Sequence, residues 1–480
     1  MKIWKSMFIK NLSYAFFAQG ISLLSSFVVQ FFCPKLLGVT EFAYWQLFLF
    51  YVSYINISRL GIIDGMYLRY GGKREEDLDG SLIKTEWMLY MIIQVSFGCI
   101  MSFIAIQFVQ DISRVFVLLS CAVCLVIINS NNYFGFLFQA INKTSIYSIS
   151  EVIYNILWFV AVLVLFVFKI DSFKVIVGFY IVGQVFAGMY LIYKFKFVFS
   201  SKIGHVRNAL HELLINLQIG LPLLIAMYSS MLITGCARMV VDLRWGIEAF
   251  SYFSFAMSLT TFILKFISQI SMVMFPALKR IDFQQQKTIY ALINNALAII
   301  LPGALVLFIP VKIIINWWLP SYETSMYYLG ILLPICIFDG KMQLLYSTYL
   351  KVLRKEKYLL VANLMAVCVS FLCALFGAYT LNSLEAIAWA LLCAIAFRSL
   401  FSSVILNLWM KIKVEYAQQI TELVIIFLFV VISTKFSNGL VFGIYLSAYI
   451  LYLALNYKTT RNTLRNFWRL REGKGENDIC

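Results

Sequence analysis

Hydrophobic residues occur along this chain in long blocks, and polar residues are concentrated in the short segments between them. Many blocks approach the roughly 20 residues that a helix needs to cross a bilayer. They are too long for barrel strands, and backbone in lipid must satisfy its own hydrogen bonds, so they predict transmembrane helices. We expect fourteen spans, over residues 11–33, 41–63, 84–108, 114–134, 146–168, 175–197, 212–236, 248–276, 288–311, 326–350, 358–380, 383–408, 417–434 and 437–457.

One short phrase recurs 208 residues apart, as LGVTEFAYWQ at 37–46 and WGIEAFSYFS at 245–254. The same offset aligns Asn131 with Asp339, Lys143 with Lys351, and Asn155 with Asn363, in that order along the chain. Each match is weak, and chance similarity between aromatic-rich helices is the alternative. Together they predict that spans 1–6 and 7–12 are two copies of one unit in the same orientation, as in transporters with parallel repeats.

The repeat gives a domain organisation. We expect an N-terminal lobe over 1–197, an inter-lobe loop over 198–211, a C-terminal lobe over 212–410, two further spans within 411–457, and a basic tail over 458–480. The tail reads as an interfacial helix on an anionic membrane surface.

The distribution of lysine and arginine predicts the orientation. If the N-terminus is inside, 27 of the 39 lysines and arginines fall in inside segments and 7 in outside segments. Both termini are therefore expected in the cytoplasm. The net charge of +16 is mostly this topology signal, and its spread over many short loops does not favour a nucleic-acid partner.

Composition excludes several classes of function. Charged residues make up 13% of the chain, against about 25% in a soluble domain. The ten cysteines are scattered, and the Cys121–Cys124 pair lies in an apolar span, so small packing residues are a better interpretation than a metal or redox site. No phosphate-binding loop and no catalytic constellation is present. We expect no cofactor, no metal and no enzymatic activity.

The opening sequence from Asn11 to Lys73 resembles the polysaccharide-transport (Wzx-like) flippases of the multidrug/oligosaccharidyl-lipid/polysaccharide exporter superfamily. The most specific part is the LG-x3-F-x-YW phrase followed by the turn Gly61–Gly65. The resemblance implies a MATE-like, V-shaped transporter of two six-helix lobes plus two C-terminal helices. It also implies a cargo, namely an undecaprenyl-diphosphate-linked oligosaccharide such as an O-antigen unit, moved from the cytoplasmic to the outer leaflet during lipopolysaccharide or other polysaccharide biosynthesis. A polysaccharide polymerase is a possible partner.

Such a cargo requires a wet cavity with cations, because its diphosphate and sugars must cross apolar depth. A basic residue at a helix centre costs about 2.5–3.5 kcal/mol by insertion scales, so it invites a functional explanation. Five basic residues fall inside predicted spans: Arg59, Lys265, Lys312, Lys341 and Arg398. Lys312 is near a span end beside two tryptophans, where a lysine snorkels to the interface. The other four are candidate cargo-binding residues.

Polar neighbours refine these candidates. Lys265 shares one helical face with Thr261, which is typical of a stripe facing water. Asp339 and Asp64 are candidate coupling or cavity acids. Asp339 points to a different side from Lys341 because the two are two residues apart. Structural pairing is the alternative interpretation, for instance Arg398 with Asp339, or Arg59 with Asp64.

The first span carries a milder polar stripe that includes Asn11, Gln19 and Ser22, which lines a cavity or packs closely through small residues.

Three function classes compete on these features. A lipid-linked oligosaccharide flippase fits the excess of mid-span cations. A cation-coupled multidrug exporter of the same superfamily would favour carboxylates, with Asp339 the main acid in a span. An integral-membrane glycan enzyme would carry a large external loop, which the chain lacks. Coupling to H⁺ or Na⁺ is possible in either transporter.

Overall fold

The computed structural model describes residues 2–278, 281–412, 416–436, 438–457, 459–462 and 465, with side chains from Gln19 onwards except 197, 269, 272, 273, 275–277 and 416. Every regular element in this described part is a helix, which confirms the all-helical prediction. The chain forms two compact units, Met1–Tyr228 (unit 1) and Ser229–Cys480 (unit 2). The lobe limits expected from the sequence stay a prediction, and most of the tail after residue 457 lies outside the described residues.

Eleven helices of the described chain are long and apolar enough to cross a membrane. The number is twelve if the bent pair Pro320–Leu332 and Ile335–Val352 forms one span. Two of the eleven, Gln19–Arg59 and Val206–Ser268, each extend over two predicted spans. The protein is therefore a multi-pass membrane protein, and the exact number of fourteen spans stays a prediction.

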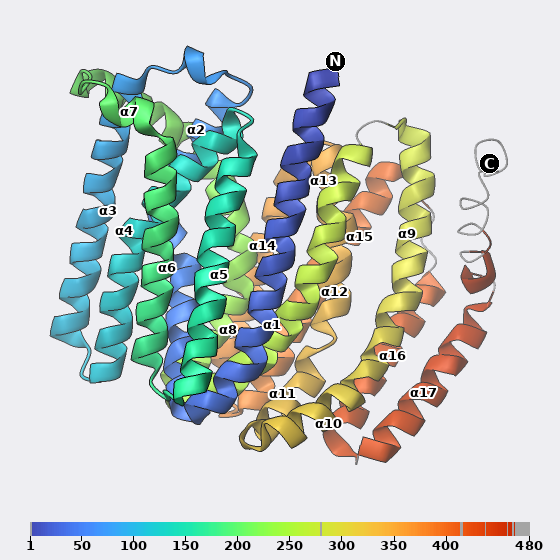
Figure 1. Ribbon diagram of the computed structural model, residues 1–480. Helices are drawn as coiled ribbons and strands as arrows, with labels where there is room; N and C mark the ends of the chain where they lie inside the picture. The colour runs from blue at the N-terminus through green and yellow to red at the C-terminus, as the bar shows by residue number, and fades with distance from the viewer. Residues whose placement is uncertain are drawn as a thin grey trace. The chain divides into compact units, whose positions relative to one another are not determined.

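Unit 1 is built from long helices that pack side by side, as Figure 1 shows for α3, α4, α5 and α6. Its elements are α1 (Lys2–Tyr54), η1 (Ile55–Arg59), α2 (Ile62–Tyr70), η2 (Glu75–Asp77), α3 (Gly80–Phe108), α4 (Ile112–Ala140), α5 (Thr144–Phe168), α6 (Phe173–Lys194), α7 (Lys196–Ser200) and the first part of α8 (Val206–Leu278). Aromatic rings fill the space between the helices, and Trp45 of α1 stacks on Trp158 of α5 at 5.1 Å between ring centroids.

The repeated phrase corresponds to the same backbone break in both units. The sequence predicts that spans are separated within 34–40 and 237–247, and the structure has a helix break in each stretch, at Gly38 in α1 and at Gly246 in α8. Gly38 has φ 70° and ψ −177°, and Gly246 has φ 80° and ψ −168°. This backbone region is essentially open only to glycine, so a single residue turns the chain without a loop. The shared break supports the internal repeat.

A second break in unit 1 separates η1 from α2 and brings α2 against α8. Leu60 and Gly61 both have positive φ, at 52° and 80°. A Cβ on Gly220 of α8 would overlap the backbone of Gly61, and a Cβ on Gly65 would overlap the backbone of Asn216. The two helices therefore approach at a distance that only glycine allows.

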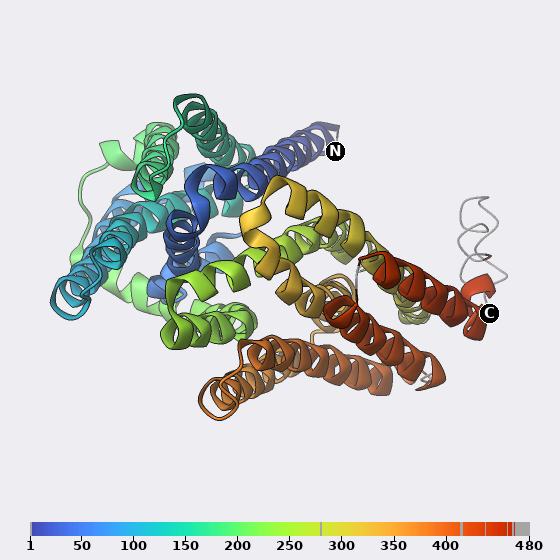
Figure 2. The same ribbon diagram turned by 90° about the horizontal axis from the view of Figure 1, so that it is seen from below.

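Unit 2 begins with the rest of α8 and ends with two helices that have no counterpart in unit 1. Its further elements are α9 (Phe283–Ala304), η3 (Leu305–Leu307), α10 (Phe308–Trp318), η4 (Pro320–Tyr322), α11 (Glu323–Leu332), α12 (Ile335–Lys341), the π-helix η5 (Met342–Tyr346), α13 (Ser347–Val352), α14 (Glu356–Tyr379), α15 (Leu384–Met410), α16 (Tyr416–Lys435) and α17 (Asn438–Leu455). The closing helices α16 and α17 pack side by side, as Figure 2 also shows, and α16 contacts α11.

The tenth predicted span, which lies in unit 2, is bent. The segments Pro320–Leu332 and Ile335–Val352 meet at 47°, and Pro334 lies at the bend. Proline has no N–H to donate to the carbonyl four residues earlier. That carbonyl, of Gly330, instead accepts a hydrogen bond from Ser433 Oγ of α16 at 3.3 Å. The C-terminal helix α16 therefore supplies a hydrogen-bond donor to a backbone carbonyl that the proline leaves without its usual N–H donor.

Candidate functional site

Arg398 of α15 and Asp339 of α12 form a buried ion pair in unit 2, in which Arg398 Nη2 donates to Asp339 Oδ1. Arg398 Nη1 donates to Ser230 Oγ at 2.8 Å and lies 3.5 Å from Asn363 Oδ1. Only 4% of the arginine side chain is exposed. Four helices, α8, α12, α14 and α15, thus meet at one guanidinium. The pairing that the sequence left open as an alternative is the one present here.

Lys341, the last residue of α12, forms a second buried pair with Glu422 of α16. Its Nζ lies 2.6 Å from each carboxylate oxygen of Glu422. Less than 10% of either side chain is exposed. Asp339 and Lys341, two residues apart, therefore have their partners on different helices. Sequence reasoning missed Glu422, although an acid inside an otherwise apolar span is the signal that could have found it.

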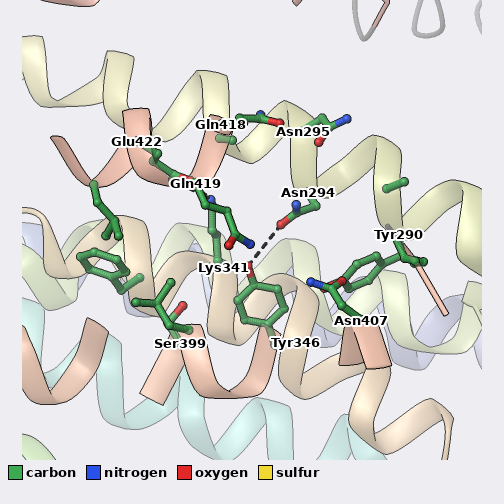
Figure 3. Close-up of a pocket in the computed structure, with 16 residues that line it drawn as sticks. Tyr290, Asn294, Asn295, Lys341, Tyr346, Ser399, Asn407, Gln418, Gln419 and Glu422 are labelled. Carbon is green, nitrogen blue, oxygen red and sulfur yellow. Dashed lines mark hydrogen bonds and ion pairs between the residues drawn. The ribbon is translucent and has the colours of Figure 1, made fainter. Parts of the chain in front are cut away.

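A polar cavity of about 120 Å³ adjoins the Lys341–Glu422 pair. Its lining residues come from α9, α12, η5, α15 and α16, and Figure 3 shows their side chains around it. Five carboxamides line it: Asn294, Asn295, Asn407, Gln418 and Gln419. Tyr346 donates to Asn294 Oδ1 at 3.2 Å. Carboxamides both donate and accept hydrogen bonds, so this wall suits water or a hydroxylated ligand.

Lys265 lies in the second half of α8, where its side chain is exposed. The hydroxyls on its predicted polar face bond within the same helix, with Thr261 Oγ1 donating to Met257 O and Ser268 Oγ donating to Lys265 O, both at 2.8 Å. Neither Lys265 nor Thr261 lines the cavity of unit 2. Their place in a cargo cavity stays a prediction.

Arg59 and Asp64 pair in unit 1 across the break between η1 and α2. Arg59 Nη2 lies 3.1 Å from Asp64 Oδ1, and both side chains are buried. The guanidinium carbon of Arg59 also lies 5.3 Å from the centroid of the Phe136 ring, within range of a cation–π contact. This pair is again the structural alternative that the sequence left open, and a role in cargo binding stays a prediction.

A hydrogen-bonded chain that the sequence did not reveal links three helices of unit 1. Arg69 of α2 pairs with Glu212 of α8 at 2.6 Å and donates to Asn216 Oδ1 at 2.8 Å. Asn216 Nδ2 in turn donates to Oε1 of the fully buried Glu86, on α3, at 2.7 Å. These residues lie beside the glycine contact between α2 and α8, so polar and steric fit act at the same place.

The polar stripe of the first span is only partly described. The side chain of Asn11 lies outside the described residues, while Gln19 and Ser22 are half-buried on α1. A neighbouring residue, Ser25, donates to the carbonyl of Asn155 on α5 at 3.3 Å. That contact is helix packing, and the cavity-lining role of Asn11, Gln19 and Ser22 stays a prediction.

Three of the four candidate cations are therefore held by carboxylates in this structure, and the fourth is exposed. Breaking a buried pair by removing one partner costs about 3–5 kcal/mol, because the remaining charge is left uncompensated. Among the described residues, no group of three or more His, Cys, Asp or Glu side chains could hold a metal ion. The chemistry available is thus ionic recognition, hydrogen bonding and proton exchange.

Comparison with known proteins supplies a family and a fold. A family model described as "Polysaccharide biosynthesis protein" matches residues 8–282. No curated protein sequence matches the chain. The structure of lipid II flippase MurJ in an inward closed conformation superposes with a TM-score of 0.68 at 14% identity, covering 94% of this chain and 99% of the flippase.

Two transporters of the MOP superfamily are also similar. An inward-facing multidrug resistance MATE family transporter gives a TM-score of 0.60 at 13% identity, covering 82% of this chain and 98% of that one. A transporter from Pyrococcus furiosus, described as having a binding pocket of reverse polarity, gives 0.54 at 12% identity, with 85% and 96% covered. At these identities the likeness concerns the fold alone, which is that of a MATE-like or MurJ-like membrane protein.

Proposed function

Since the chain belongs to the polysaccharide biosynthesis protein family, we propose that it is a flippase for a lipid-linked oligosaccharide. The cargo is an undecaprenyl-diphosphate-linked repeat unit of O-antigen or another surface polysaccharide, moved from the cytoplasmic to the outer leaflet of the bacterial inner membrane. The family match is the observation that carries the proposal. It is supported by the bundle of membrane-length helices and by the MurJ-like fold.

The buried basic residues have a defined part in this proposal. A diphosphate passing through apolar depth needs cations, and charges in a low-dielectric setting act strongly. In the present state, carboxylates pair with Arg398, Lys341 and Arg59. The diphosphate of the cargo can therefore bind these cations only by displacing the carboxylates or after the carboxylates are protonated. Lys265 is exposed, and we assign it the first contact with the diphosphate.

Substitution of Lys265 tests the proposal. The full-length protein is reconstituted in liposomes with fluorescent undecaprenyl-diphosphate oligosaccharide, and movement between leaflets is measured with a membrane-impermeant quencher. We expect slower movement with Lys265→Ala and slower still with Lys265→Glu, because a carboxylate repels the diphosphate. Lys435→Ala, at the end of α16, is the control and leaves the rate unchanged. Equal rates for wild type, Lys265→Ala and Lys265→Glu would remove Lys265 from the cargo path, and no movement with the wild type would remove the flippase function.

A second candidate is a cation-coupled multidrug exporter. The buried acids Asp339, Asp64 and Glu422 and the MATE-like fold favour it, since carboxylates suit cationic cargo. The liposome measurement separates the two, because an exporter would carry organic cations such as ethidium and leave the lipid-linked oligosaccharide in its leaflet. Binding of a coupling ion, H⁺ or Na⁺, at Asp339 or Asp64 stays a prediction.

A further inference from the structure

The two buried pairs of unit 2 differ in their capacity to exchange protons. The guanidinium of Arg398 stays protonated in proteins, and its terminal nitrogens already have Asp339, Ser230 and Asn363 as partners. The carboxylate of Glu422, by contrast, has Lys341 as its partner and adjoins a polar cavity. Of these two pairs, Lys341–Glu422 is therefore the one that can gain or lose a proton without breaking a four-helix junction.

The Lys341–Glu422 pair lines the polar cavity, which has room for water, whereas neither Arg398 nor Asp339 lines it. The space of about 120 Å³ beside Lys341 and Glu422 is large enough for about four waters at roughly 30 Å³ each. Gln418 is buried, and its amide nitrogen has no hydrogen-bond partner among the described residues. An unpartnered buried donor at the wall of a polar cavity is the position at which an ordered water is expected.

The cavity lies toward one end of the helices. It is lined by Tyr290 near the start of α9, Asn407 near the end of α15 and Gln418 near the start of α16. Lys287 in the first turns of α9 and Lys411 directly after α15 lie at this end, and basic residues at helix ends are typical of the cytoplasmic side. The cavity thus gives a path for protons from one side of the membrane.

We propose that Glu422 is a proton-binding site of the transporter, reached from one side of the membrane through this cavity, with Lys341 as its counter-ion. The proposal rests on the proposed function and assigns the proton to the added helix α16. A hydronium ion in the cavity transfers its proton to the Glu422 carboxylate and leaves a water molecule. Lys341 stays an ammonium, so the net charge of the pair rises from zero to +1.

Protonation changes what Lys341 offers to a cargo. With Glu422 neutral, the ion pair becomes a single weaker hydrogen bond, and the ammonium charge is no longer cancelled within unit 2. A proton bound at Glu422 therefore increases the attraction for an anionic cargo, which links the two binding events. The other titratable groups nearby are tyrosines, Tyr290, Tyr346 and Tyr452, while Asp339 and Arg398 compensate each other. Lys411 is exposed outside the cavity.

The test separates a proton site from a purely structural pair. Lys341→Met/Glu422→Gln removes both charges together, so it avoids a lone buried charge and preserves thermal unfolding of the full-length protein in detergent. In liposomes with fluorescent lipid-linked oligosaccharide, the double variant should move the cargo between leaflets more slowly than the wild type, because it lacks the cargo-binding charge of Lys341. It should lose the acceleration that an imposed pH gradient gives the wild type.

Matched variants complete the test. Glu385→Gln is the control, because Glu385 of the same unit is bonded to Tyr327 at 2.7 Å away from the cavity, and the variant keeps the acceleration. Gln418→Leu, which makes the cavity wall apolar, should reduce the acceleration while thermal unfolding stays unchanged. A double variant that responds to the gradient as the wild type does would overturn this inference and leave the flippase function standing. Absence of cargo movement in the wild type would instead overturn the function itself.

Discussion

The fourth span of unit 1 and the tenth span of unit 2 occupy equivalent places in the repeat but differ in backbone and chemistry. The first is the unbroken helix α4, 29 residues long. The second consists of η4, α11, α12, the π-helix η5 and α13, with a 47° bend. π-Helical turns are frequent at functional sites. The irregular copy is also the one that carries Asp339 and Lys341.

The side chains at matching positions of the repeat also differ, because those in unit 1 are neutral and those in unit 2 are charged. Asn131 of α4 donates to the backbone carbonyl of Gln184 at 2.9 Å, whereas its counterpart Asp339 binds Arg398. Tyr133, which is fully buried in unit 1, corresponds to Lys341. The comparison teaches that the equivalent positions hold a neutral amide and an aromatic ring in unit 1 and charges in unit 2, where α16 supplies Glu422 as a partner.

The largest expected effect comes from breaking the charged copy. Arg398→Ala leaves Asp339 buried without its cation and should cost about 3–5 kcal/mol of unfolding free energy. The double variant Asp339→Asn/Arg398→Gln, which gives unit 2 the amide chemistry of unit 1, should recover most of that loss. Thermal unfolding of the purified protein measures both. If the double variant is no more stable than Arg398→Ala, uncharged amides cannot replace the Arg398–Asp339 pair in unit 2.

The glycine breaks should behave alike in the two units. Gly38→Ala and Gly246→Ala each place a Cβ in a backbone region nearly closed to other residues, at about 1–3 kcal/mol. Gly178→Ala in α6 is the control, because a Cβ there meets nothing within 4 Å and helical alanine is favoured over glycine. Unequal losses of stability at the two breaks, measured by thermal unfolding, would show that the two units have the same backbone break but that it contributes differently to their stability.

The starts of the two spans give a smaller test. Asp111 caps α4 by accepting from the backbone N–H groups of Ser113 and Arg114, at 2.8 and 3.3 Å, whereas the matching position in unit 2 is Leu319. Asp111→Ala should cost about 1 kcal/mol of unfolding free energy, measured by thermal unfolding, because the cap is lost, whereas Leu319 makes no side-chain cap hydrogen bond at the start of η4.

The same cap has a pH dependence. Burial raises the pKa of the Asp111 carboxyl, but hydrogen bonds from Tyr44 and the cap N–H groups outweigh it and hold that pKa below its usual value. The carboxylate form is thus favoured in the folded protein, and its stabilisation is present above the unfolded pKa and lost as the pH falls through the folded pKa. Acid unfolding of Asp111→Ala should lack this contribution, and identical acid profiles for wild type and variant would contradict the cap.

The smallest expected effect concerns the bend. Ser433→Ala removes the hydrogen bond to the Gly330 carbonyl, worth about 0.5–1.5 kcal/mol. In a Pro334→Ala background, the new N–H at 334 competes for that carbonyl, so Ser433→Ala should cost less. A double-mutant cycle by thermal unfolding gives the difference. Additive losses would mean that the hydrogen bond from Ser433 contributes the same whether or not residue 334 is a proline.

The fold could be largely predicted from sequence because spans and breaks are local. The apolar blocks marked the helices, and the recurrence of Gly38 and Gly246 marked the repeat at equal backbone breaks. The separation between spans was predicted at both places, but that a single glycine makes each break could not be seen from the apolar pattern alone.

The candidate site was predictable only in part. The basic residues inside spans were visible, but their partners depend on which helices lie beside one another, and that is a tertiary property. Glu422 became relevant only when α16 was found against the bent span, and Glu86 only when Asn216 was found beside it. The choice between cavity and pairing for Arg398 required the same information.

The glycine contact between α2 and α8 has a consequence for biosynthesis. Gly220 and Asn216 complete unit 1, yet the ribosome reaches them only after all the earlier helices of that unit have been made. Until then Arg69 and Glu86 lack their partners on α8. A nascent chain that ends near residue 200 is therefore an intermediate in which α2 lacks its contact with α8. A chain extended past residue 228 can form that contact. Assembly of the first half thus waits for translation to enter the second copy of the repeat.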